Sequence, residues 1–169
     1  MKKQISFLLF SVLLFSGCTA PQYFWPQEDI GFQEINQPTL EKKILIASHN
    51  TEFKTNVVNK IKDAFLNKDV YIKISGLENL ENEDANQYSA VVLLNTAMGW
   101  KADRKVRSFL VRFGKLNHII VLTTSDTADV TADTGGDRQI DAITSASSKD
   151  ETEEVANNII NKINTLISR

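Results

Sequence analysis

The sequence predicts an α/β fold in which a five-stranded parallel sheet, in strand order 2-1-3-4-5, lies between two layers of helices. Two short and uniformly apolar segments, Ile44–Ala47 and Ala90–Leu94, have the pattern of central strands buried on both faces. After residue 43, segments with strand and helix patterns alternate along the chain, as expected when helical crossovers join parallel strands. We therefore expect one three-layer domain with right-handed crossovers.

Within this domain the apolar spacing places each element. The expected strands are about 43–48, 70–74, 90–94, 119–122 and 140–144. Helices are expected at about 52–67 and 101–113, and a last one opens at a Ser148–Glu151 capping box. The polar segment 77–87 predicts a short or missing helix. A long loop at 125–139 carries four aspartates whose spacing matches no calcium-binding loop, so no metal site is predicted.

Residues 1–17 have the features of an export signal. Two lysines precede an apolar segment that is too short to span a bilayer as an ordinary transmembrane helix. The chain then reads Leu-Phe-Ser-Gly-Cys18, which resembles the lipobox of bacterial lipoproteins, where the cysteine thiol receives diacylglycerol. The resemblance implies lipidation at Cys18, which is the only cysteine of the chain and so has no disulfide partner within it.

Residues 18–42 are interpreted as the lipidated cysteine and a tether, because they contain the three prolines and show no clean period. The folded domain is expected at 43–169. Thr19 directly follows the cysteine, and the absence of Asp there resembles the export signal of outer-membrane lipoproteins in two-membrane bacteria. The expected location is therefore a membrane, with the domain facing the periplasm or the cell exterior.

The charge of the chain excludes one class of partner. The formal net charge is −2, and it falls to −4 when the two leader lysines are removed. A nucleic-acid-binding domain would show a basic surplus or stripe. The expected partners are instead the membrane, through the lipid, and a protein or a small anionic ligand.

Polar side chains gather in the loops that follow the predicted strands. In parallel sheets the carboxyl ends of the strands form one edge, where ligands commonly bind. The first of these loops also precedes a helix start, whose free N–H groups favour anions. The candidate ligand-binding residues are Ser48, His49, Asn50, Thr51, Lys54, Asn95, Thr96, Trp100, Thr124 and Ser125.

The first loop resembles a known one. Ile-Leu-Ile-Ala-Ser48 followed by Asn50-Thr51-Glu52 resembles the flavodoxin phosphate loop, which reads Ser/Thr-x-Thr-Gly-Asn-Thr before the first helix. The order of elements from about 43 to 167 is also similar to that of flavodoxins. The resemblance implies a flavodoxin-like fold and, as a cofactor, flavin mononucleotide (FMN) with Trp100 stacked on its ring.

The chain departs from that pattern in two places. His49 stands in a loop that lacks the glycine, and the segment 123–139 has no aromatic residue for the second side of the flavin. A receiver domain is excluded because the strand ends lack its aspartates, and no Gly-x-Gly-x-x-Gly follows the first strand. No nucleophile–base or paired-carboxylate pattern indicates catalysis. The favoured hypothesis is a non-enzymatic binding or interaction module on an envelope lipoprotein, and the alternative is an FMN-binding electron-transfer protein.

Overall fold

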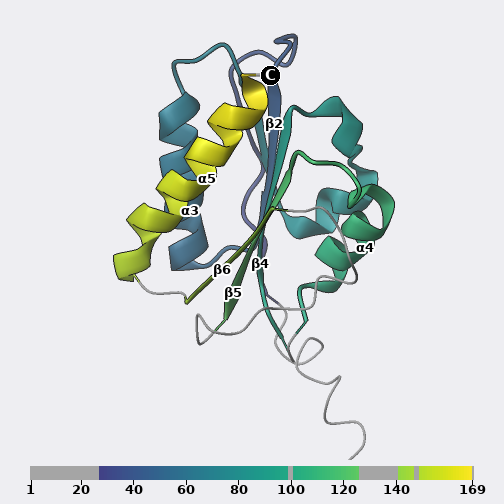
Figure 1. Cartoon of the computed structure of the whole chain (residues 1–169), viewed down its shortest axis with the longest axis vertical. Coiled ribbons are helices and arrows are strands. Elements are labelled where there is room, and N and C mark those ends of the chain that lie inside the picture. The colour runs from purple at the N-terminus through teal and green to yellow at the C-terminus, as the bar shows by residue number, and fades with distance from the viewer. Residues whose placement is uncertain (1–26, 99–100, 126–140, 147–148, 169) are drawn as a thin grey trace, which may run out of the picture.

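The computed structural model describes residues 27–98, 101–125, 141–146 and 149–168, with the backbone alone described for 141–146 and 149. These residues form a layered α/β domain (Figure 1). Its strands are β1 (Gln33–Ile35), β2 (Lys43–Ser48), β3 (Tyr71–Ser75), β4 (Ala90–Thr96), β5 (Ile119–Ser125) and β6 (Asp141–Ala146). Its helices are α3 (Glu52–Phe65), α4 (Arg104–Phe113) and α5 (Thr152–Ile167), with 3-10 turns η2 (Leu77–Asn82), η3 (Ala85–Gln87) and η4 (Lys149–Glu151).

The strands form one mostly parallel sheet in the order β1-β3-β2-β4-β5-β6. All neighbours from β3 to β6 are parallel, whereas β1 pairs with β3 in antiparallel fashion. The predicted α/β class with a largely parallel sheet is confirmed. The expectation of five strands in the order 2-1-3-4-5 is wrong in one respect, because a sixth strand is added at the outer side of β3.

Side chains from β2 and β4 pack into both apolar layers. Ile44 and Ile46 face α3 and α5, while Leu45 and Ala47 face α4 and the two 3-10 turns η2 and η3. Figure 1 shows α3 and α5 on one side of the sheet and α4 on the other. Alternate side chains of a strand point to opposite faces, so a strand covered on both sides has to be apolar throughout. This explains the uniform apolar character that the sequence shows in these two segments.

Strand β1 lies within the stretch interpreted as a tether. Its three residues Gln33–Ile35 pair with Ile72–Ile74 of β3, so β3 is not an edge strand of the sheet. Asn36, with φ of 65°, turns the chain after β1, and its side-chain amide donates to the carbonyl of Val70 at 2.7 Å. A three-residue strand is too short to show a period, which is why the sequence pattern did not reveal it.

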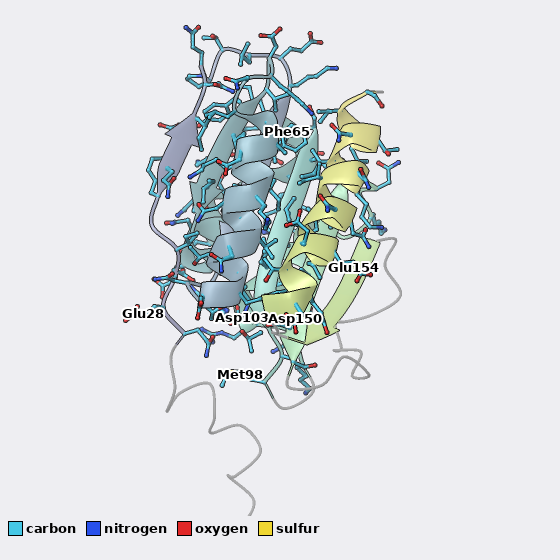
Figure 2. The ribbon with its side chains drawn as sticks, turned by 90° about the vertical axis from the view of Figure 1, so that its left-hand side faces the viewer. Glu28, Phe65, Met98, Asp103, Asp150 and Glu154 are labelled. Atoms are coloured by element: carbon cyan, nitrogen blue, oxygen red, sulfur yellow. The ribbon has the colours of Figure 1, made fainter. Side chains whose placement is uncertain are left out.

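Residues 27–30, which we call the strap, cross the edge of the sheet where the parallel strands end. We call this side of the sheet the carboxyl edge, and Glu28 lies there in Figure 2. The Ile30 N–H donates to the Ser48 carbonyl at 3.1 Å, and the Asn50 N–H donates to the Glu28 carbonyl at 2.7 Å. Asp29 accepts a 2.9 Å hydrogen bond from the Glu78 N–H at the start of η2. The strap therefore ties the loop after β2 to the turn after β3.

The helix boundaries differ slightly from expectation. Helix α4 begins at Arg104 because Asp103 is its N-cap, with its carboxylate accepting from the Lys105 N–H at 2.6 Å. The 3-10 turn η4 precedes α5, and Glu151 makes no side-chain capping bond. Ser148 of the expected capping box and the four aspartates of the expected 125–139 loop lie outside the described residues.

We predict that Gly76→Ala destabilises the domain by displacing the strap. A Cβ atom at residue 76 would lie 2.4 Å from Oδ2 and 2.5 Å from Cβ of Asp29, far inside van der Waals contact. Overpacking of this kind typically costs about 1–3 kcal/mol. Gly31→Ala is the matched control, because a Cβ there meets nothing within 4 Å. Urea unfolding of both variants is the measurement, and equal stability of the two would contradict the strap contact.

Candidate functional site at the carboxyl edge

The structure places the described candidate residues at or beside the carboxyl edge. Ser48 ends β2, Thr51 caps α3, and Asn95 and Thr96 end β4. Thr124 and Ser125 end β5, which pairs with β4 up to Thr96–Thr124. Trp100, the expected stacking residue, lies outside the described residues.

The backbone of the loop after β2 is already hydrogen-bonded within the protein. The His49 N–H donates to the Leu94 carbonyl at 3.3 Å, and the Asn50 N–H donates to the Glu28 carbonyl. Thr51 has an extended conformation and its hydroxyl accepts from the Lys54 N–H at 3.4 Å, so it serves as the N-cap of α3. The Asn50 side chain accepts a 3.1 Å hydrogen bond from the Thr55 hydroxyl. The loop is thus closed by contacts with β4 and with the strap, and by side-chain contacts to the start of α3.

His49 occupies the position where the resembling motif has glycine, and its side chain is buried, with 5% exposed. Its Nε2 lies 3.8 Å from Oδ2 of Asp103. Nδ1 has no hydrogen-bond partner among the described residues. Burial lowers the pKa of His49 below its ordinary value, against the opposing effect of Asp103, and the nearby Lys54 lowers it further. Burial therefore favours the neutral imidazole.

Lys54 is the most unusual group of the site because only 1% of it is exposed. Its Nζ donates to Oγ1 of Thr96 at 2.8 Å, and the Thr96 hydroxyl in turn donates to Oε1 of Gln27 at 3.3 Å. Burial lowers the pKa of the Lys54 ammonium group to about 8. The prediction that Lys54 and Thr96 belong to one site is consistent with this contact, although the lysine points inward rather than to solvent.

The remaining candidates hold the ends of the strands together. The Asn95 side chain donates to the Leu122 carbonyl and the Thr123 hydroxyl, at 3.0 and 3.1 Å, and accepts from the Asp103 N–H at 2.9 Å. The Thr124 hydroxyl donates to the Asn95 carbonyl at 3.3 Å. Ser48 is buried, and its hydroxyl donates to the His49 carbonyl at 2.8 Å. These three side chains satisfy buried backbone groups.

Sequence reasoning missed four residues that complete this edge. Gln27, Glu28 and Asp29 come from the strap, which carries no motif and was interpreted as tether. Asp103 was missed although an acidic residue immediately before a helical pattern is a recognised N-cap signal. Its carboxylate bonds the Lys105 N–H and also faces His49.

Two backbone N–H groups of the loop after β2 are not free for an FMN phosphate. Phosphate binding at a helix start needs free backbone N–H groups. Here the N–H groups of His49 and Asn50 are bonded to Leu94 and Glu28, and the strap backbone runs where an anion would approach the latter. Freeing the Asn50 N–H for an anion would first require the strap to leave the loop.

Two further observations concern metal ligands and His118. In the described part of the chain, no group of three or more His, Cys, Asp or Glu side chains could hold a metal ion. His118 lies with Nε2 3.0 Å from the Ala85 carbonyl, which links β5 to the turn η3. That contact gives His118 a structural role.

Comparison with known proteins supports the fold alone. No protein-family model matches the sequence, and no curated protein matches it. An archaeal flavodoxin has a similar structure, with TM-score 0.50 and 10% identity, over 73% of this chain and 98% of the flavodoxin. Oxidised flavodoxin 2 of Bacillus cereus has TM-score 0.53 and 16% identity over the same shares. The flavodiiron core of Flv1 from Synechocystis has TM-score 0.55 and 12% identity, covering 78% of this chain and 38% of that one. The domain is therefore flavodoxin-like in fold.

We predict that Lys54→Met removes a pH dependence of stability. Between about pH 8 and 10.5 the unfolded chain holds more protons on Lys54 than the folded chain, so the free energy of unfolding rises with pH. From pH 7 to pH 9 this contribution amounts to about 1 kcal/mol. Urea unfolding at both pH values should show this rise in the wild type and a smaller rise in the variant. Lys62→Met, at a half-buried position on the same helix, is the control. An unchanged rise in Lys54→Met would contradict the burial of the ammonium group.

Proposed function

We propose that this protein is a cell-envelope lipoprotein whose flavodoxin-like domain is a non-enzymatic binding or interaction module. The lipid anchor rests on the resemblance of the sequence before Cys18 to a lipobox, and residues 1–26 lie outside the described part of the chain. The described residues contain no helix long and apolar enough to cross a membrane. Thr19 after the cysteine supports export to the outer membrane in a cell with two membranes.

The closed loop after β2 is the observation that carries the non-enzymatic proposal. A catalytic group has to reach a substrate, yet the titratable side chains at the carboxyl edge with the most unusual surroundings, His49 and Lys54, are buried. In the same loop, the N–H groups of Asn50 and His49 donate to the carbonyls of Glu28 and Leu94. These contacts support a role in which the edge is structural and recognition uses exposed surface.

The same contacts bear on the identity of the partner. A small anion at the start of α3 would have to compete with the Glu28 carbonyl for the Asn50 N–H, and with the Thr51 cap. Each of these interactions is worth about 1 kcal/mol, comparable with the gain from a helix terminus. We therefore favour a protein partner at the membrane over a small anionic ligand.

Lipidation at Cys18 is tested by mass and by membrane partition. The mature protein should begin at an acylated Cys18 and float with phospholipid vesicles, because each buried acyl methylene contributes about 0.8 kcal/mol. Cys18→Ala should abolish both the added mass and the flotation, whereas Thr19→Ser should leave both unchanged. An unmodified Cys18 thiol in the mature wild-type protein would contradict the proposed lipid anchor.

The electron-transfer alternative makes a different prediction. A protein that binds FMN should purify yellow or take up added FMN with a change in flavin absorbance. We expect no uptake at micromolar FMN and no shift of the amide signals of His49 and Asn50, since both N–H groups are already bonded. A bona fide flavodoxin treated in parallel is the positive control. Stoichiometric flavin in the preparation would overturn the proposed module in favour of the alternative.

A further inference from the structure

The place where the N-terminal chain meets the domain is fixed by the strap. Two backbone hydrogen bonds hold it: the Asn50 N–H donates to the Glu28 carbonyl, and the Ile30 N–H donates to the Ser48 carbonyl. Asp29 adds a third contact, to the Glu78 N–H, and packs on Gly76. In Figure 2, Glu28 lies at the same end of the domain as Met98, Asp103 and Asp150, while Phe65 lies at the opposite end. The strap thus joins the domain at its carboxyl edge.

Few residues separate the strap from Cys18. Ten residue steps separate Cys18 from Glu28. A fully extended chain of this length spans at most about 35 Å, since each residue adds about 3.3–3.6 Å. A flexible chain of this length has a root-mean-square end-to-end distance of only about 17 Å. If Cys18 is acylated, Glu28 therefore stays close to the surface of the bilayer.

The opposite orientation would require a stretched tether. Helix α3 has 14 residues and runs from the carboxyl edge to the far end of the domain. At 1.5 Å per residue it is about 21 Å long, which exceeds the root-mean-square span of a random chain of ten residues. A domain turned over would hold Glu28 at least that far from the lipid, which is beyond the span of about 17 Å that is typical of a random chain of this length. Chain entropy opposes that arrangement.

We propose that the carboxyl edge is the surface of the domain that faces the lipid bilayer. This inference rests on the proposed lipid anchor at Cys18 and adds the orientation that the strap imposes on it. The end of the domain that carries Phe65 then faces away from the membrane. A partner of the carboxyl edge is accordingly the lipid surface itself, and a partner from the aqueous compartment meets the other end and the helical faces.

The charges at the carboxyl edge indicate how the domain is held there. Among the described residues, Glu28 and Asp150 are exposed acids at this edge. Lys101, which pairs with Met98, and Arg104, the first residue of α4, are exposed bases, so these four residues show no cationic surplus. Binding to anionic lipid headgroups depends on a clear cationic surplus, at about 1 kcal/mol for each basic residue near the surface. The tether, and not electrostatic adsorption, therefore sets the orientation. The orientation should be insensitive to salt.

Two matched cysteine variants test the orientation in the full-length lipidated protein. Asn50→Cys and Asn67→Cys replace exposed asparagines at the two ends of α3. Acylation consumes the thiol of Cys18, the only native cysteine, so the introduced thiol is the one that takes a fluorophore. Energy transfer to an acceptor lipid is then measured in phosphatidylcholine vesicles, at low and at high salt. Intact mass, flotation and thermal unfolding are recorded for each labelled protein beforehand.

The proposal expects higher transfer from residue 50 than from residue 67, at both salt concentrations. Inserting 20 Gly/Ser residues after Ala20 should reduce that difference, because the typical span of the tether rises to about 30 Å. Equal transfer from both positions, or higher transfer from residue 67, in a protein that is acylated and floats would overturn the orientation and leave the anchor intact. A protein that is neither acylated nor floats would overturn the anchor and this orientation together.

Discussion

Strands β2 and β4 are buried on both faces, and this burial determines which hydrogen bonds the polar groups at their carboxyl ends must form. A strand that emerges between two apolar layers delivers its last polar groups into a region with little water, where each needs a partner within the protein. At the end of β4, the Asn95 side chain finds its partners by hydrogen bonding to the backbone of β5 and to the backbone N–H at the start of α4. At the end of β2 the strap supplies a partner, since Ile30 bonds the Ser48 carbonyl. Many of the polar residues that resemble a binding site thus form hydrogen bonds with backbone groups at the ends of the strands.

Lys54 is a second polar group buried at the carboxyl edge, and its burial has an energetic cost. A pKa of about 8 in place of 10.5 corresponds to about 3 kcal/mol of unfavourable desolvation. A hydrogen bond from a charged donor returns about 1.5–3 kcal/mol, so the bond to Thr96 offsets that cost only in part. The methylenes of the side chain, buried in the first turn of α3, add favourable apolar burial. A buried lysine with one described acceptor is therefore tolerable without an ion-pair partner.

The central sheet and its helices could be predicted because their signals are repeated many times. Val57 and Ile61 on α3 recur at helical spacing, and Ile44 to Ala47 form a continuous apolar strand. The strap and β1 could not be predicted, because their role depends on single backbone bonds and on one carboxylate, Asp29, which give no period. Topology predicted that the candidate residues would share one edge of the sheet, and the described ones lie at or beside it. The burial of His49 and Lys54 could not be inferred, because their side chains pack near residues distant in the sequence, Asp103 and Thr96.

The antiparallel pairing of β1 also has a consequence for proteins that share one membrane. Molecules confined to a surface meet at high local concentration, and an open strand edge is a template on which neighbouring sheets can join. Strand β1 covers the outer side of β3 and has only three residues, of which Gln33 and Glu34 are exposed. The outermost strand on this side of the sheet is therefore short and carries a charge. Under the proposed membrane anchor, this short, charged strand would disfavour sheet-to-sheet pairing between neighbouring copies.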